Sequence, residues 1–153
     1  LTLARANNNL GWYYHEDIKY DSAYNYYYRA VNFYNKLGLY RNEGEVLLNM
    51  GNIQQSVKDY VGSEANAVRA IQLIQSLPET ENNLDTLWSL HNLIGLISLD
   101  LGLFDKSIEY HRKGLEYSNR MTENYIYDLY TSVNIALVYA EMNDNDEWMS
   151  FNK

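Results

Sequence analysis

The sequence contains no cysteine and a single proline, Pro78, among its 153 residues. The absence of cysteine excludes disulfides, thiolate metal sites and cysteine nucleophiles, and it leaves the cellular compartment open. One proline and eight glycines indicate that long helices dominate, because few positions force the chain to break. No run approaches the roughly 18 apolar residues of a membrane helix, so we expect no membrane insertion.

Basic residues are also few. Lys and Arg total 12 against 20 acidic residues, which gives a formal charge of −8. Nucleic-acid-binding proteins neutralise phosphates with clustered Lys and Arg, whereas the basic residues here are scattered, so we expect no nucleic-acid partner. The acidity keeps a domain soluble and mildly favours a neutral or basic partner. The chain begins with Leu1, so we expect a domain excised from a longer protein.

The sequence motifs of common enzymes are missing. It has no glycine-rich phosphate loop, no GxSxG and no HExxH, and nothing places two carboxylates in one cleft. The three histidines, His15, His91 and His111, lack the three- or four-residue spacing of metal ligands on a helix. We therefore predict no enzyme, no cofactor and no metal. His91 and His111 are interpreted as packing residues, whereas His15 fits either a groove or plain surface.

What the chain has instead is a repeat. Gly11, Gly51, Gly95 and Ala136 stand 40, 44 and 41 residues apart. An apolar residue precedes each of them, an aromatic residue follows nine positions later in three units, and small residues follow at 12 and 19 positions. These columns are Leu10, Met50, Ile94 and Ile135; Tyr20, Tyr60 and Phe104; Ala23, Ser63 and Ser107; and Ala30, Ala70 and Gly114.

Each column has a physical reason. A small residue inside one helix lets a second helix pack close, and the aromatic residue fills the wedge at the turn. Helices are predicted at 3–16, 20–37, 42–56, 58–76, 82–102, 105–119 and 122–142, with an eighth beginning at 145. Gly38 is predicted to end the second helix. The predicted N-caps are Asn42, Asp105 and Asp144.

This pattern resembles the tetratricopeptide repeat. The resemblance rests on Leu10-Gly11, Tyr14, Tyr20, Ala23, Tyr27 and Ala30, and on Ile94-Gly95, residues 101–110 and Gly114. It implies an all-α fold, a right-handed superhelical array of antiparallel helix pairs with about 3.5 repeats. We expect one domain, 1–153, with units at 3–38, 42–77 and 82–119 and an incomplete unit at 122–153. The units exceed the usual length of about 34 residues, a variety familiar in bacterial signalling proteins.

The resemblance implies a scaffold that binds a peptide or helical segment of a partner protein in its concave groove. By fold analogy it would be the sensory or docking part of a bacterial regulatory protein. One alternative is a structural module that self-associates weakly through its terminal helices, since the fourth unit is incomplete. Another is a small-ligand sensor or an enzyme, which would need a closed pocket with converging polar groups.

Asparagine recurs two residues before the small residue, at Asn9, Asn49 and Asn134, and the third unit has Leu93 there. Asparagine is unfavourable inside a helix, so its recurrence needs a reason. The resemblance places this position in the groove, where an amide can donate to and accept from a peptide backbone. The alternative interpretation is that these asparagines cap or bridge neighbouring helices.

Three residues further along each helix, the same groove face is predicted to carry Trp12, Asn52, Leu96 and Leu137. One turn beyond lie His15, Gln55, Leu99 and Ala140. We therefore expect a groove that is polar at its start and apolar from the third unit on. Too few Lys and Arg line it for the family's carboxylate clamp. The predicted peptide-binding residues are Asn9, Trp12, Asn49, Asn52, Leu96 and Asn134.

Overall fold

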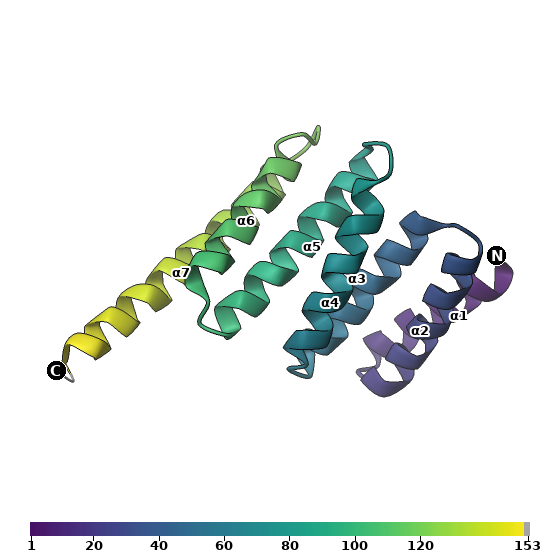
Figure 1. Cartoon of the computed structure of the whole chain (residues 1–153), viewed down its shortest axis with the longest axis horizontal. Coiled ribbons are helices and arrows are strands. Elements are labelled where there is room, and N and C mark those ends of the chain that lie inside the picture. The colour runs from purple at the N-terminus through teal and green to yellow at the C-terminus, as the bar shows by residue number, and fades with distance from the viewer. Residues whose placement is uncertain (152–153) are drawn as a thin grey trace.

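The chain folds into seven α-helices within the part that the structure describes (Figure 1). The computed structural model describes the backbone of residues 1–151 and the side chains of residues 1–143. Consecutive helices pack as antiparallel pairs, α1 with α2, α3 with α4 and α5 with α6. The helices are α1 (Thr2–Glu16), α2 (Tyr20–Lys36), α3 (Tyr40–Ser56), α4 (Tyr60–Gln75), α5 (Glu81–Asp100), α6 (Phe104–Ser118) and α7 (Tyr125–Phe151).

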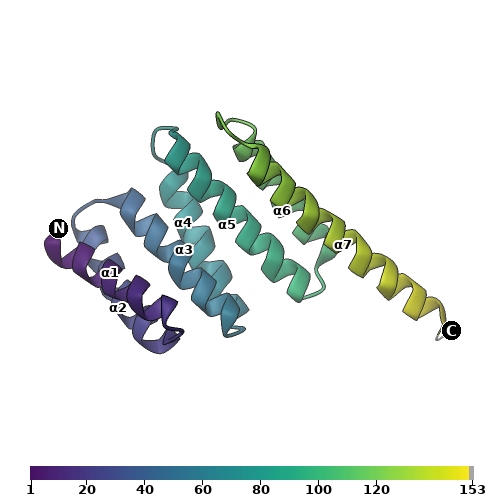
Figure 2. The same cartoon turned by 180° about the vertical axis from the view of Figure 1, so that it is seen from behind.

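The helices form two layers. Figure 2 shows α1, α3, α5 and α7 in front, with α2, α4 and α6 behind them. We call the first set the first layer and the second set the second layer. Within the first layer, α5 contacts both α3 and α7. The predicted all-α array of stacked helix pairs is thereby confirmed.

The small residues of the first layer lie where paired helices approach each other. A Cβ atom on Gly95 would lie 2.7 Å from the His111 ring, and one on Gly11 would overlap the Tyr27 ring. Tyr27 and His111 occupy the same place in their units, 16 residues after the glycine. A ring of α2 or α6 therefore rests directly on the backbone of its partner helix, which only glycine permits.

The second pair makes the same contact in a different way. Ala67 stands where Tyr27 and His111 stand, and it has no ring with which to cover Gly51. Leu93 of the following pair covers it instead, with its Cδ2 atom 2.9 Å from where a Cβ on Gly51 would lie. Leu93 is 3% exposed. The third unit therefore has leucine rather than asparagine at this position because the side chain fills a gap in the second unit.

Buried serines add a hydrogen bond to two of these contacts. Ser63 Oγ donates to the carbonyl oxygen of Gly51, and Ser107 Oγ donates to that of Gly95, each at 2.7 Å. Both serines are fully buried, so an unpaired hydroxyl there would be costly. The repeated serine column thus links each second-layer helix to the backbone of its first-layer partner.

Four of the connections between helices use the same turn. One residue of each turn has a left-handed backbone, and these residues are Ile18 (φ 56°), Gly38 (φ 65°), Lys58 (φ 64°) and Gly102 (φ 69°). The next amide then donates to a carbonyl five residues back, as Leu39 does to Tyr34 at 3.0 Å. This is the hydrogen bond of a Schellman cap. Gly38 ends the second helix as predicted.

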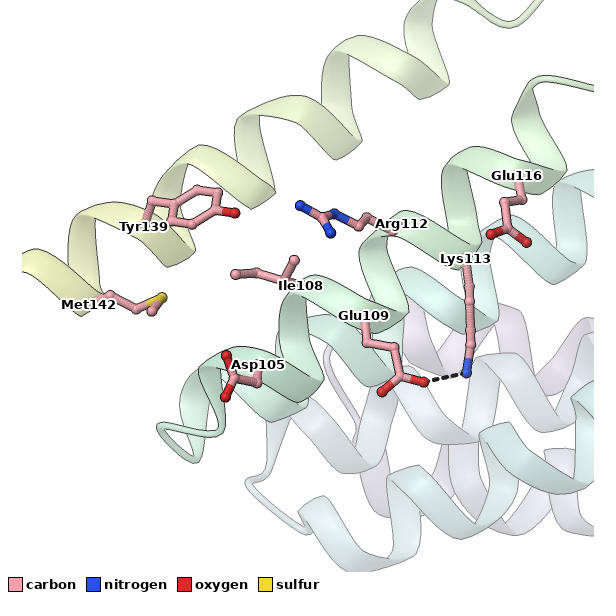
Figure 3. A pocket seen from close by; sticks show the side chains of 8 residues that line it. All are labelled: Asp105, Ile108, Glu109, Arg112, Lys113, Glu116, Tyr139 and Met142. Carbon is pink, nitrogen blue, oxygen red and sulfur yellow. Dashed lines mark hydrogen bonds and ion pairs between the residues drawn. The ribbon is translucent and has the colours of Figure 1, made fainter.

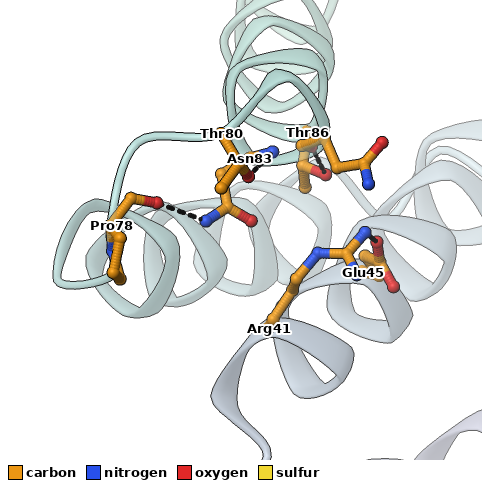
Figure 4. Close-up of polar contacts among 7 residues, drawn as sticks. Arg41, Glu45, Pro78, Thr80, Asn83 and Thr86 are labelled. Carbon is orange, nitrogen blue, oxygen red and sulfur yellow. Dashed lines mark hydrogen bonds and ion pairs between the residues drawn. The ribbon is translucent and has the colours of Figure 1, made fainter.

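The connection between α4 and α5 is longer and is held by side chains (Figure 4). Thr80 is the N-cap of α5, and its Oγ1 accepts from the Asn83 amide at 3.2 Å. Asn83 Nδ2 donates to the carbonyl oxygen of Pro78 at 2.8 Å. At the start of α3, Arg41 pairs with Glu45 at 2.6 Å. The two contacts of Asn83 fix the loop where the spacing between repeats is largest.

Two of the predicted N-caps are wrong. Asn42 is the third residue of α3, and Asp105 is the second residue of α6. The actual N-cap residues are Leu39 and Leu103, which make no side-chain capping bond. The shared turn already directs the chain into each helix, so these helices begin earlier than the first capping side chain.

The prediction that the last helix ends at 142, with a new helix from 145, is also wrong. The α7 backbone is helical from Tyr125 to Phe151, so Asp144 lies inside the helix and is not its N-cap. The Asp144 side chain lies outside the described residues. Asn and Asp favour caps and turns, which is why residues 143–146 indicate a break. Within the described chain, no helix has both the length and the apolar character needed to cross a membrane.

Replacing Gly95 by Ala should lower the free energy of unfolding by about 1–3 kcal/mol, because the new methyl group meets the His111 ring. Urea titration monitored by circular dichroism measures the loss. In a His111→Ala background, Gly95→Ala should lower the free energy of unfolding by much less. An equal cost in both backgrounds would contradict the proposed contact.

Lys58→Gly should raise the free energy of unfolding by up to about 1 kcal/mol, because a left-handed φ is strained for lysine and not for glycine. Gly38→Ala, in the equivalent turn, should lower it by about 1 kcal/mol, although a Cβ there meets nothing within 4 Å. Thermal melts of the two variants test the pair, and shifts of the same sign would be inconsistent with it.

Candidate functional site

An open cleft of about 290 Å³ lies on the first layer, where α3, α5 and α7 meet. Every residue that lines it comes from first-layer helices, so the second layer is not needed to form it. One wall, from α3, carries the amides of Asn52 and Gln55. The other is mostly apolar and aromatic, with Leu96 and Trp88 from α5 and Tyr130 from α7. The full lining is Leu48, Asn52, Gln55, Trp88, Ser89, Asn92, Leu93, Leu96 and Tyr130.

The aromatic wall is held by α7. Trp88 Nε1 donates to Thr131 Oγ1 at 3.0 Å. The Trp88 ring packs edge-on against Tyr127 and Tyr130, with centroids 4.8 and 5.6 Å away. Thr131 Oγ1 in turn donates to the Tyr127 carbonyl oxygen at 2.9 Å. The indole is therefore fixed before any guest arrives, which lowers the entropic cost of binding.

Beneath the cleft, a buried polar chain links α5 to α6. Asn92 Nδ2 donates to the Trp88 carbonyl oxygen at 3.0 Å, so Asn92 Oδ1 faces His111. His111 Nδ1 lies 2.8 Å from that oxygen and therefore carries the proton of a neutral ring. Its Nε2 atom has no hydrogen-bond partner. Burial lowers the pKa of His111 to about 4, because a charged ring there would lose its hydration.

The structure brings two of the predicted groove residues together. Asn52 and Leu96, one position after the small residue in their units, face each other across the cleft. Gln55 joins them from the next turn of α3, as the columns predict. The α3 wall carries two amides, and the α5 wall is mainly apolar.

The other four predicted residues lie elsewhere. Asn9 is exposed, Trp12 is 59% exposed, and neither lines the cleft. Asn49 is half-buried beside the cleft rather than in it. Asn134 is only 6% exposed, and its Nδ2 atom has no hydrogen-bond partner. A residue buried to that degree cannot line an open groove, so the expectation for Asn134 does not hold.

The sequence analysis did not identify the cleft residues that come before the small residue of their own unit. Trp88 stands seven positions before Gly95, and Ser89 and Tyr130 stand six before Gly95 and Ala136. The predicted columns follow the groove face only toward the end of each helix. Steps of three and four residues backward from Leu96 reach the same face and would have found them.

The histidines pack against other groups, as predicted for two of them. His91 is buried, and its Nδ1 lies 2.8 Å from the Leu87 carbonyl oxygen. Burial lowers the pKa of His91. His15 is half-buried and packs edge-on against Tyr20 and Tyr27, so it does not line the cleft. Within the described residues, no three metal-binding side chains lie close enough to hold an ion.

A second, larger cleft of about 490 Å³ opens where α7 runs past α6 (Figure 3). Its charges are mixed, since Arg112 and Lys113 lie near Glu109 and Glu116. Lys113 pairs with Glu109 at 2.6 Å on the surface of α6. Tyr139 and Met142 of α7 form the opposite side. Its charged groups largely neutralise one another and do not converge on a point, so the geometry favours no reaction there.

Comparisons with known proteins agree with the repeat geometry. Residues 89–120 match the sequence model of the tetratricopeptide repeat family. The crystal structure of BtubC (BKLC) from P. vanneervenii is similar, with a TM-score of 0.79 at 19% sequence identity over 92% of this chain. The fold is an array of stacked helix pairs, and residues 89–120 of it match a tetratricopeptide repeat. The match spans 57% of the BtubC chain. No curated protein has a matching sequence.

In this array of helix pairs, the matched segment contains the second half of α5 and all of α6. Like the two units before it, this unit fills the four columns, with Gly95, Phe104, Ser107 and Gly114. It also supplies four of the nine residues that line the cleft, Ser89, Asn92, Leu93 and Leu96 of α5. The matched segment therefore includes part of one wall of the candidate site.

The free energy of unfolding should decrease as the pH is lowered from about 6.5 to about 4, because of His111. The unfolded ring takes up a proton near pH 6.5, whereas the folded ring does so only near 4, so acid favours unfolding. The slope contributed is at most about 1.4 kcal/mol per pH unit. Urea titrations over this range should give a shallower slope for His111→Gln. The pH slope that remains in this variant would come partly from His91. An unchanged slope would show that His111 is not the source.

Proposed function

We propose that this chain is a protein-interaction scaffold that binds a segment of a partner protein in the first-layer cleft. Tetratricopeptide repeats generally mediate protein–protein interaction. The observation that carries the proposal is a rigid, open cleft with amides on one wall and apolar anchors on the other. Recognition surfaces commonly combine a buried aromatic anchor with surrounding polar contacts.

The two walls have different tasks in this proposal. Asn52 and Gln55 each carry an amide that can donate to and accept from a peptide backbone, whatever its sequence. Leu96, Trp88 and Tyr130 offer apolar surface to the guest's side chains, and Tyr130 is 47% exposed. Backbone contacts would provide affinity for an extended segment, and the aromatic wall would select its side chains.

The proposal assigns no catalytic residue and no cofactor. The cleft holds no carboxylate and no histidine side chain among its lining residues. An open, shallow cleft of this kind suits a peptide rather than an enclosed small molecule. By analogy of fold alone, the chain would be the sensory or docking part of a bacterial regulatory protein.

Self-association through the repeat ends is a second candidate. It is favoured by the apolar side chains that both ends expose, such as Leu3 and Tyr13 on α1, which are 63% and 59% exposed. Light scattering at high protein concentration separates the candidates. If the repeat ends do not pair, the protein should remain a monomer at high concentration. A molar mass that increases with concentration would favour self-association.

Replacing Asn52 and Leu96 by Ala together should weaken partner capture by about tenfold or more, because it removes an amide and an anchor. Melting temperature should change little, since both side chains are only half-buried. The measurement is an affinity pull-down quantified by mass spectrometry for wild type and variant. Val68→Ala, on the exposed surface of α4, is the matched control. Proteins captured equally by all three chains do not bind in the cleft.

A further inference from the structure

A cleft of about 330 Å³ lies on the second layer, between α4 and α6, and we call it the second-layer cleft. Side-chain bridges join its two walls. At one end, Gln75 Nε2 of α4 donates to the hydroxyl oxygen of Tyr117 of α6 at 2.7 Å. Beyond the other end, Lys106 of α6 pairs with Glu64 of α4 at 2.6 Å. The bridges stand 11 residues apart on both helices, which is about 16 Å. They hold the space between the helices at a fixed width.

The base of this cleft is His91 of α5, which is only 4% exposed. Its Nδ1 atom lies 2.8 Å from the Leu87 carbonyl oxygen, and because a carbonyl only accepts, Nδ1 carries the proton of the ring. Burial lowers the pKa of His91, so the ring is neutral and Nε2 keeps its lone pair. Nothing among the described residues donates to this Nε2, and unlike the enclosed Nε2 of His111 it is open to the cleft. The cleft therefore has an unused hydrogen-bond acceptor at its base.

The equivalent place one unit earlier, between α2 and α4, is filled by an ion pair. Glu43 of α3 is fully buried there, Arg69 of α4 pairs with it, and Asn35 of α2 donates to its Oε2 atom at 3.1 Å. The same positions of the following units carry Leu87, Lys113 and Gln75. Because Leu87 offers no carboxylate, Lys113 pairs with Glu109 of its own helix instead, at 2.6 Å. The space that side chains fill between α2 and α4 is therefore open between α4 and α6.

Packing does not require a histidine at the base of the cleft. The same position of the second unit is Leu47, which is 1% exposed, so leucine fits beneath two second-layer helices. A buried imidazole loses hydration that leucine never had, and an acceptor without a partner adds to this cost. His91 therefore lowers stability at a place where the fold could avoid it, as is typical of residues that serve binding.

The charges near His91 narrow the chemistry of a guest. An acceptor needs an N–H or O–H group, so a carboxylate cannot serve. Besides burial, the charge of Lys113 lowers the pKa of His91, and Glu116 opposes it more weakly. A guest cation would meet the same repulsion that a proton meets, so a neutral donor is favoured.

The walls of the cleft favour an aromatic guest. The rings of Tyr117 and Tyr110 flank the His91 ring, with centroids 5.0 and 5.9 Å from it. Ile71 adds an apolar side chain from α4. Aromatic rings pack well against such walls, and tyrosine and tryptophan carry a donor at the end of an apolar body. The volume lies at the lower end of the range for ligand pockets, about 300–1,000 Å³, so it suits one ring rather than a helix.

We infer that the second-layer cleft binds a tyrosine or tryptophan side chain of a partner protein, whose phenol or indole group donates to His91 Nε2. The exposed amide of Gln72, on the rim, is placed to meet the backbone of the same guest segment. No residue lines both this cleft and the first-layer cleft. The inference therefore stands whether or not the first-layer cleft binds a peptide.

NMR titrations of the nitrogen-15-labelled chain with two small probes test the inference. N-acetyl-tyrosinamide has both the ring and the donor, whereas N-acetyl-phenylalaninamide has the ring alone. The tyrosine probe should bind about three- to tenfold more tightly, which is the effect of one neutral hydrogen bond. It should move the His91 Nε2 signal toward lower chemical shift and leave Nδ1 nearly unchanged. The amide signals of Asn52 and Leu96 should not move.

His91→Leu is the decisive variant, because Leu47 shows that leucine fits this place. It should melt no lower than wild type, and it should bind the two probes equally, within about twofold. The matched control is Asn52→Ala with Leu96→Ala in the first-layer cleft, which should keep the preference for the tyrosine probe. The Nε2 signal of the unmodified chain tests the contact without relying on any variant.

Two further probes test the source of the ring. The tripeptide acetyl-Gly-Tyr-Gly-amide should bind more tightly than p-cresol, because Gln72 can bond to its backbone. Tighter binding of p-cresol would make a free small molecule the occupant and overturn the assignment to a partner protein. The inference also fails if no probe shifts His91, if the tyrosine and phenylalanine probes bind wild type equally, or if His91→Leu keeps the preference.

Discussion

Close side-chain contact with the backbone of first-layer helices, at Gly11, Gly51 and Gly95, underlies the whole array. At Gly11 and Gly95 the first-layer helix has no side chain, and a ring of the second-layer helix rests on its backbone. Tight packing there fixes the distance between the layers. The first-layer helices can then leave their other face uncovered, because most of their apolar surface is already buried against a partner. The cleft exists because that second face stays free.

The helices could be predicted from the sequence with little error. Six of them begin and end within two residues of the predicted bounds, because the columns around Gly11, Gly51 and Gly95 mark both helices of each pair. The seventh could not be predicted in this way. The sequence 143–146 has the composition of a turn, yet helix geometry continues through it. Local propensity is a weak guide where no packed column marks a boundary.

The site was predictable only in part, because one column places Asn52 and Leu96 on adjacent first-layer helices, whereas Trp12 of the same column lies outside the cleft. The asparagine column failed because its surroundings change along the array. This position faces the preceding pair, so Asn9 on the first helix is exposed, whereas Leu93 and Asn134 are buried. A sequence column records side-chain type, and burial depends on which neighbour lies beside it.

Leu93 reaches out of its own pair to cover Gly51, where Ala67 is too short to do so. This makes the pairs of the array non-interchangeable. Transplanting the first pair into the second place would set a tyrosine ring and Leu93 in the same space, and the reverse exchange would leave a void. The packing effects of substitutions at residues 67 and 93 are therefore coupled. The centre of the molecule, from α3 to α6, should open and close as one cooperative block rather than as two independent modules.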